Sequence, residues 1–324
     1  MVITLNFPDP ELERTFRTYR NYFASVANSL RGVYGMQPEA GAIAATRELG
    51  SVRRIERRKG RTTSIDSALR LGWSLEVQVR LAGWLGAEVL PYMLAGALAN
   101  TYYAVYHVMR ATLFGAGLDV PRAHRAALNV MSDFCRRGLF PTPWGVMCTS
   151  CHDNPDSFIG LPYDATFPDH EQLAEPTPEA QWTILCRLLR TTREREVQAL
   201  CDEELTRLRR RCPERKRLSP GTRDGIDARM TGTTLFDVFW RMRKRSHYGD
   251  VDAFVQGVLD PDDGVILHAD LLTTLGATLG VLETLLVSYR GFDLVEGASR
   301  DLLRQDRSGV TSDGIGARLE HLRP

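Results

Sequence analysis

The chain has 324 residues, of which 43% are hydrophobic and 25% are charged. That length excludes a single small bundle, and the composition is ordinary for a soluble globular protein with one elaborated domain or two modest ones. The net charge of +1 averages over local blocks and excludes no class of partner. Only three basic residues are lysines, so nearly all positive charge is arginine, which reflects either codon usage or a need for paired phosphate contacts.

The start of the chain and its cysteines indicate the compartment in which the protein works. The opening MVITLNFPDPELER has no basic start followed by an apolar run, so we expect no secretion signal and a cytoplasmic protein. Six cysteines in such a chain indicate reduced thiols or a metal site, not a framework of disulfides.

The N-terminal part of the chain predicts a series of helices. From Pro10 to about Arg31 apolar side chains recur every three or four residues, which predicts an amphipathic helix. We expect a short helix over residues 39–49 and another over residues 68–84. Between them lies a basic run, residues 53–61, which is either a solvated surface or a source of electrostatic attraction for nucleic acid.

The most apolar stretch of the chain is a predicted helix over residues 88–114. Most of it lacks charged side chains over about the length of a membrane span. Because it also holds Pro91, Asn100 and His107, which make a poor lipid-facing surface, we expect a buried core helix and no membrane partner. A glycine turn then leads to a helix predicted over residues 122–137.

The second half of the chain is less regular. Residues 140–176 contain six prolines and no helical period, so we expect an irregular loop or a small inserted element. A long helix over residues 177–211, which ends in a basic cluster, predicts either a protruding hairpin or an arm that binds a partner. Residues 219–232 are rich in turn formers.

No segment of the chain shows a strand pattern or a repeat. Helices are then expected over 233–245, 264–289 and 294–303, followed by a weakly ordered tail.

Two stretches carry a resemblance to a known family. NTYYAVYHVMRATLFGAGLDVPRAHRAALNVMSDF, residues 100–134, resembles the first helical pair of HEPN domains (higher eukaryotes and prokaryotes nucleotide-binding). FWRMRKRSHYGD, residues 239–250, and the apolar helix after Gly264 resemble the second half of that domain. The resemblance implies an all-α fold, an antiparallel helical bundle that forms a homodimer.

The resemblance also divides the chain into five segments. The two halves of the bundle would be residues 87–140 and 233–290. An insertion between them, residues 141–232, would contain an irregular loop and a helical arm, which departs from the compact family pattern. The outer segments are an N-terminal helical extension, residues 1–86, and a C-terminal helix with a tail, residues 291–324.

Many HEPN proteins are ribonucleases that use an Arg and a His with four to six residues between them. Arg241 and His247 have five residues between them, whereas Arg243 and His247 have only three. Arg243 instead matches the family pattern of an Arg followed by four residues and a Tyr, here Tyr248. On an unbroken helix Arg243 and His247 share a face, while Arg241 lies farther round the helix. The predicted catalytic set therefore keeps both arginines: Arg241, Arg243, His247 and Tyr248.

These residue types suit RNA cleavage. A histidine takes or gives a proton near neutral pH, and an arginine stabilises the charge that develops on the phosphate. We expect further RNA contacts from Lys244, Arg245, His107 and Arg110. For His107, Arg110 and also His124, the alternative is hydrogen bonding inside the bundle. The nearby tyrosines are expected to pack in the core, namely Tyr102, Tyr103 and Tyr106.

Cys148 and Cys151 have the spacing of half a zinc site. A full site needs two more ligands, and the sequence has no second pair with this spacing. Cys135, His152 or His170 would have to supply them from elsewhere in the fold. A structural zinc ion is thus the one cofactor that the sequence suggests, and the predicted cleavage itself uses none.

Together these observations predict a metal-independent endoribonuclease, a toxin or an antiviral-defence effector, that cleaves RNA at a site shared by two subunits. The alternative is a non-catalytic HEPN-like module. It would bind a nucleotide, RNA or a protein partner such as an antitoxin within a defence or toxin–antitoxin assembly. A third hypothesis is a zinc-stabilised scaffold in which the inserted arm makes the functional contacts.

Overall fold

The structure is a computed structural model, and it describes residues 9–52, 62–119, 123–152, 155–161, 181–210, 214, 217–248, 250–257, 260–306 and 309–324. Within these ranges the chain forms twelve α-helices and one small sheet, so the prediction of an all-α fold is confirmed. The helices are α1 (Pro10–Tyr34), α2 (Pro38–Val52), α3 (Thr62–Ala82), α4 (Leu90–Gly115), α5 (His124–Arg136), α6 (Gln181–Arg209), α7 (Pro220–Arg229), α8 (Leu235–Tyr248), α9 (Val251–Gln256), α10 (Pro261–Arg290), α11 (Phe292–Gln305) and α12 (Ala317–Leu322).

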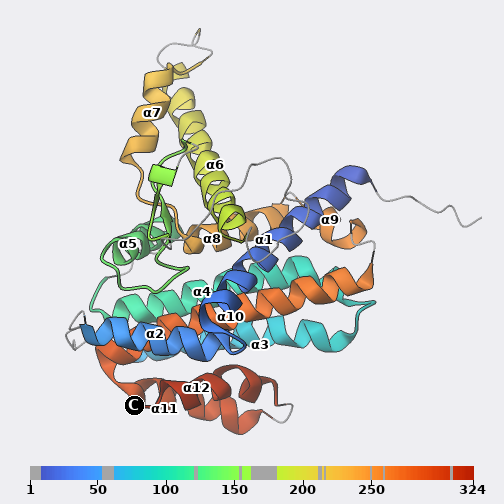
Figure 1. Ribbon diagram of the computed structural model, residues 1–324, viewed down its shortest axis with the longest axis vertical. Helices are drawn as coiled ribbons and strands as arrows, with labels where there is room; N and C mark the ends of the chain where they lie inside the picture. The colour runs from blue at the N-terminus through green and yellow to red at the C-terminus, as the bar shows by residue number, and fades with distance from the viewer. Residues whose placement is uncertain are drawn as a thin grey trace, which may run out of the picture.

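Two long apolar helices, α4 and α10, form the centre of the molecule (Figure 1). Helix α3 packs along α4, and α2 packs along α10. Helix α8 also contacts α4, while α1 contacts both α10 and α6. In Figure 1 α11 and α12 lie at the bottom of the bundle, and α6 and α7 project together from the top. The bundle is thus built in layers around α4 and α10, with the α6–α7 pair as an outward extension.

Helix α10 is buried because its neighbours approach it closely. A Cβ atom at Gly276 would lie 2.7 Å from the Glu39 carboxylate, and one at Gly280 would lie 2.9 Å from Ile43. These two glycines, one turn apart, therefore let α2 pack directly against the backbone of α10. Among the described residues, α10 is the one helix long and apolar enough to cross a membrane, and 72% of its most apolar window is buried inside the protein.

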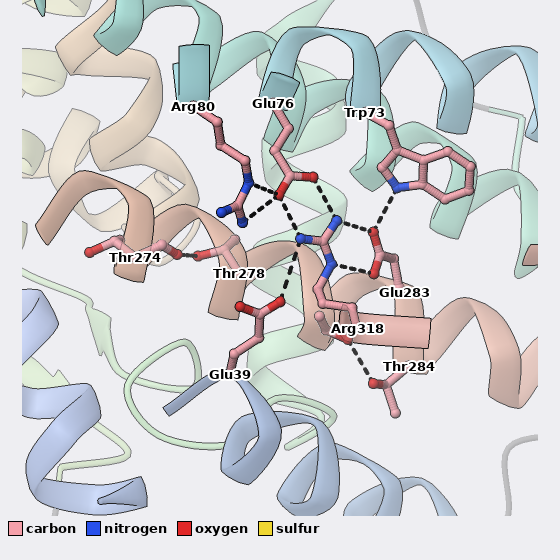
Figure 2. A network of polar contacts seen from close by, with 10 residues as sticks. Glu39, Trp73, Glu76, Arg80, Thr274, Thr278, Glu283, Thr284 and Arg318 are labelled. Atoms are coloured by element: carbon pink, nitrogen blue, oxygen red, sulfur yellow. Dashed lines mark hydrogen bonds and ion pairs between the residues drawn. The ribbon is translucent and has the colours of Figure 1, made fainter. Parts of the chain in front are cut away.

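A buried ionic network fastens the C-terminal helix to this core (Figure 2). The Arg318 guanidinium on α12 is fully buried. It donates to both oxygens of Glu76 at 2.7 Å and to both oxygens of Glu283 at 2.8 and 3.0 Å. Glu39 lies 3.5 Å away, and the Trp73 indole donates to Glu283 at 2.8 Å. Helices α2, α3, α10 and α12 are thereby joined through one side chain.

Two sequence predictions about the C-terminal half are wrong. The segment after residue 303 was expected to be a weakly ordered tail, but a short π-helix, Ser312–Gly316, and α12 follow there and Arg318 is buried. Residues 219–232 were expected to be turns, but α7 spans most of them, with the Ser219 side chain accepting from the Thr222 amide as an N-cap. In both segments the glycine and polar residues did not predict a helix, and tertiary contacts stabilise the helix that forms.

A small element joins the α6–α7 extension to the bundle. Strands β1 (Met147–Cys148) and β2 (Phe158–Ile159) pair antiparallel, and Cys148 also bridges to Thr233 just before α8. The fully buried Arg193 of α6 donates to the Cys148 carbonyl of β1 at 3.3 Å. Its guanidinium donates to the Asp227 carboxylate at 2.6 Å and to the Thr231 carbonyl at 2.8 Å. Arg193 therefore ties α6 to α7 and to the start of α8.

Candidate functional site

Helix α8 directs its basic side chains to different sides. Arg241 is only 7% exposed, and its Nη1 donates to the hydroxyls of Thr191 and Thr192 on α6, at 2.8 and 2.9 Å. Arg243 instead donates through Nη2 to the Tyr103 hydroxyl on α4, at 2.6 Å. Residues two positions apart on a helix point about 200° apart. The two arginines that the sequence proposed for catalysis therefore do not converge.

Arg243 belongs to a surface of aromatic and basic side chains on α4, α5 and α8. The His124 ring stacks on the Trp240 ring with centroids 4.8 Å apart, and it lies 4.2 Å from the Tyr106 ring. The Arg243 guanidinium lies 5.2 Å from the centroid of Trp240 and 5.3 Å from that of Tyr103. We call this cluster the basic face, and it consists of Tyr102, Tyr103, Tyr106, His107, Arg110, His124, Trp240, Arg243 and Lys244. Tyr102 and Tyr106 are buried beneath it in the core, and the other side chains are partly or fully exposed.

Arg110 and His107 complete the basic face on α4. The Arg110 guanidinium lies 5.8 Å from the centroid of Tyr106 and 5.5 Å from that of Phe114. Its Nε is buried and reaches no hydrogen-bond acceptor among the described residues. The His107 ring meets the edge of Tyr106 at 5.5 Å. The structure thus brings His107, Arg110, Arg243 and Lys244 of the predicted site to one surface.

Burial lowers the pKa of both imidazoles of the basic face. Burial and then the charges of Arg110 and His124 lower the pKa of His107 from 6.5 to about 4. Burial, Arg243 and Arg110 likewise lower the pKa of His124. The Tyr102 hydroxyl, whose pKa burial raises, forms a hydrogen bond of 2.5 Å with His124 Nδ1.

Lys244 lies at the edge of the basic face, beside α5 and α6. Its ammonium is 5.4 Å from the Trp240 ring and 3.4 Å from Glu196. Glu196 also forms an ion pair with Arg125 of α5. A single buried carboxylate therefore offsets two of the cations here, whereas Arg243 and Arg110 lie over aromatic rings.

Arg245, also predicted to contact RNA, lies on the Arg241 side of α8. It forms a two-pronged ion pair with Asp250 at 2.5 and 2.8 Å, and the Tyr19 hydroxyl donates to the same carboxylate at 2.5 Å. His247 and Tyr248 end α8, but their side chains lie outside the described part of the chain. Position 247 follows Arg243 by one helical turn and so lies on the same side of α8 as the basic face. The catalytic role of His247 stays a prediction.

The two cysteines predicted as half a zinc site lie close to α7. The Cys148 thiol contacts the Ser150 carbonyl at 3.1 Å, and the Cys151 thiol contacts the Asp227 carboxylate at 3.5 Å. Burial raises the pKa of Cys148 to about 11 and that of Cys151 to about 12, so both are thiols at neutral pH. Within the described ranges no three His, Cys, Asp or Glu side chains are placed to hold a metal ion, and His170 lies outside those ranges.

Sequence patterns alone did not single out Trp240 and left His124 without a definite role. Both are central to the basic face, because Trp240 stacks on His124 and also lies beneath Arg243. The only local signal was the spacing of Trp240 and Arg243, one turn apart on a helix. The contact with His124 depends on how α5 packs against α8, which no local pattern contains.

Comparison with protein-family models, curated proteins and solved structures gave no match for this chain. Function is therefore inferred from the chemistry of the basic face and from the residues that resemble HEPN motifs.

Proposed function

We propose that the basic face binds single-stranded RNA and, together with His247, cleaves it without a metal ion. The observation that carries this proposal is the position of Arg243, whose guanidinium lies over two aromatic rings beside His124. Proteins that bind single-stranded RNA combine aromatic side chains, on which bases stack, with arginine and histidine donors to phosphate. Trp240, Tyr103 and Arg243 offer this combination on one surface.

Cleavage requires three kinds of group around one phosphate. A base removes the proton of the 2′-hydroxyl, whose oxygen attacks phosphorus, and an acid gives a proton to the departing 5′-oxygen. The products are a 2′,3′-cyclic phosphate and a free 5′-hydroxyl. We assign the proton transfers to His247 and charge stabilisation to Arg243. We further assign to His124 the tautomer with its proton on Nε2, which would donate a hydrogen bond to a phosphate oxygen.

The proposed site is shared between two subunits. One imidazole cannot act as base and as acid in the same step, whereas two copies of His247 supply both groups. A homodimer that places two basic faces side by side would also supply two copies of Arg243 around one phosphate. In a cell such an enzyme would act as a toxin or an antiviral-defence effector, held silent by a partner such as an antitoxin.

The test is cleavage of a labelled single-stranded RNA by purified protein. His247→Ala and Arg243→Gln should each lower the cleavage rate by about 10²-fold or more, which is typical of a lost acid–base or charge-stabilising group. His321→Ala is the matched control, because His321 is exposed on α12, and it should cleave at the wild-type rate. EDTA should have no effect. Full activity of His247→Ala, or loss of wild-type activity in EDTA, would refute the assignment.

One observation favours a second candidate function, in which the basic face binds RNA without cutting it. Arg241 has the family spacing to His247 but is bonded to α6, away from the basic face. Arg243 lies on the basic face but has only three residues between it and His247. In a non-catalytic module, wild-type protein would shift labelled RNA in a gel, Arg243→Gln would abolish the shift, and no product would form even with the protein's genomic neighbours added.

A further inference from the structure

A cationic cavity lies on the side of α8 that faces away from the basic face. Its volume is about 440 Å³, and α1, α6 and α8 line it together with Asp250. This volume lies within the range of small-molecule sites in proteins, about 300–1,000 Å³. The lining contains four guanidinium groups from three helices, those of Arg14, Arg195, Arg241 and Arg245.

Arg241 forms the inner wall of this cavity. Thr191 and Thr192 hold its Nη1, and the Tyr22 ring lies 5.9 Å from its guanidinium carbon. The side chain is 7% exposed, and its Nε is buried without an acceptor among the described residues. Burial and then the charge of Arg195 lower the pKa of Arg241 to about 10. The protein therefore fixes a guanidinium in place while leaving part of its hydrogen-bonding capacity unused.

Two of the three carboxylates that line the cavity already have a partner. Asp250 is held by Arg245 and by the Tyr19 hydroxyl, which also line the cavity, so it offsets one of the four guanidinium groups. Glu194 lies 3.6 Å from Arg190, an arginine that is not part of the cavity lining. Glu11 is exposed in the first turn of α1. None of the described carboxylates forms an ion pair with the two remaining arginines of the lining, Arg14 and Arg195.

A ligand that matches this lining is a compact anion with several acceptor oxygens. Arginine forks pair with phosphate in a two-pronged geometry, and charge-assisted bonds of this kind are the stronger class of hydrogen bond. The cavity is wider than a phosphate group alone needs, which leaves space for an attached nucleoside or sugar. We propose that the cavity binds a small phosphomonoester, with its phosphate against Arg241 and Arg195. This site is independent of the proposed RNA cleavage.

The experiment is isothermal titration of the full-length protein with five probes: inorganic phosphate, adenosine 5′-monophosphate, glucose 6-phosphate, adenosine and glucose. The phosphate-bearing probes should bind saturably and the uncharged ones should not, and the two esters together show whether a nucleoside or a sugar is preferred. Arg195→Gln should weaken binding of the best ester by about tenfold or more, the effect of losing a charge-assisted hydrogen bond.

Two features of the design keep the outcome decisive. Arg195 is exposed, so Arg195→Gln should melt at the wild-type temperature and report on binding alone. Arg187→Gln changes another exposed arginine of α6 that does not line the cavity, and it should bind the ester as the wild type does. The proposal is overturned if no phosphate-bearing probe binds, if adenosine binds as tightly as its monophosphate, or if Arg195→Gln weakens RNA binding alone.

Discussion

Loss of the buried Arg318 guanidinium should strongly destabilise the fold. Arg318→Met leaves Glu76 and Glu283 as buried carboxylates without their main partner (Figure 2). Breaking a buried ion pair from one side costs about 3–5 kcal/mol, so the free energy of unfolding, measured by urea denaturation at pH 7, should fall by that amount. Arg300→Met removes an exposed arginine paired with Glu296, and it should cost less than about 1 kcal/mol. Equal losses in the two variants would contradict this account.

Glu76 gives the same network a pH dependence that can be isolated. Burial alone would raise the pKa of Glu76, but Arg318 and then Arg80 outweigh it and lower the pKa from 4.5 to about 2. A carboxyl whose pKa is lowered on folding stabilises the protein above its unfolded pKa, and this stabilisation is lost as the pH falls through the folded pKa. Glu283 and Glu39, whose pKa values burial raises, act in the opposite direction. The free energy of unfolding of the wild type, plotted against pH, therefore contains contributions of opposite sign.

Subtracting the free energy of unfolding of Glu76→Gln from that of the wild type isolates the contribution of Glu76. We expect this difference in the free energy of unfolding to be constant above about pH 4.5 and to shrink as the pH falls toward about 2. Urea denaturation of both proteins at a series of pH values measures it. A difference that grows on acidification would show that Glu76 is not the ionised partner of Arg318.

At the scale of elements, α8 presents Arg243 to the basic face, which we propose binds RNA, and Arg241 to the cationic cavity on its other side. Arg243→Gln should lower RNA affinity and reduce the slope of log affinity against log salt by about 0.7, the share of one cation on single-stranded nucleic acid. Arg241→Gln should leave that slope unchanged and lower the melting temperature, since Arg241 is buried against Thr191 and Thr192. Fluorescence anisotropy with labelled RNA over a salt series compares them. Equal changes in slope would mean that both arginines contact RNA.

Helices with a strong apolar period were predictable from the sequence. The spacing that starts at Pro10 and the apolar run after Gly264 predicted α1 and α10, and both are present. Helices α7 and α12 were missed, since α7 buries only Ile226 among its own residues. Helix α12 depends on Arg318 meeting glutamates far away along the chain. A local sequence pattern shows the period of the apolar residues, but it does not show distant partners such as these glutamates.

The basic face was predictable in part. Position along the chain suggested His107, Arg110, Arg243 and Lys244, because each belongs to a stretch that resembles HEPN motifs. It could not show that Arg241 points to α6, because the side to which a helical residue points depends on which neighbours pack there. The cationic cavity was not predictable for the same reason, since its arginines come from three helices that are distant in sequence.

At the scale of the whole molecule, one hydrophobic core runs from Phe16 in α1 to Leu322 in α12. The helices of the predicted N-terminal extension and of the C-terminal segment therefore share a core with those of the HEPN-like segments. A rigid core of this kind gives the basic face a fixed geometry, because α4, α5 and α8 all contribute side chains to it.

A site that needs two chains should lose activity on dilution. If each catalytic centre contains His247 from both subunits, the cleavage rate per subunit should follow the fraction of protein that is dimeric. Cleavage of labelled RNA over a dilution series, with mass measured by light scattering at each concentration, checks this expectation. A monomer that cleaves at the same rate per subunit would place the whole reaction within one chain. In that case the second proton transfer would have to pass to His124, whose imidazole contacts Trp240 on the basic face.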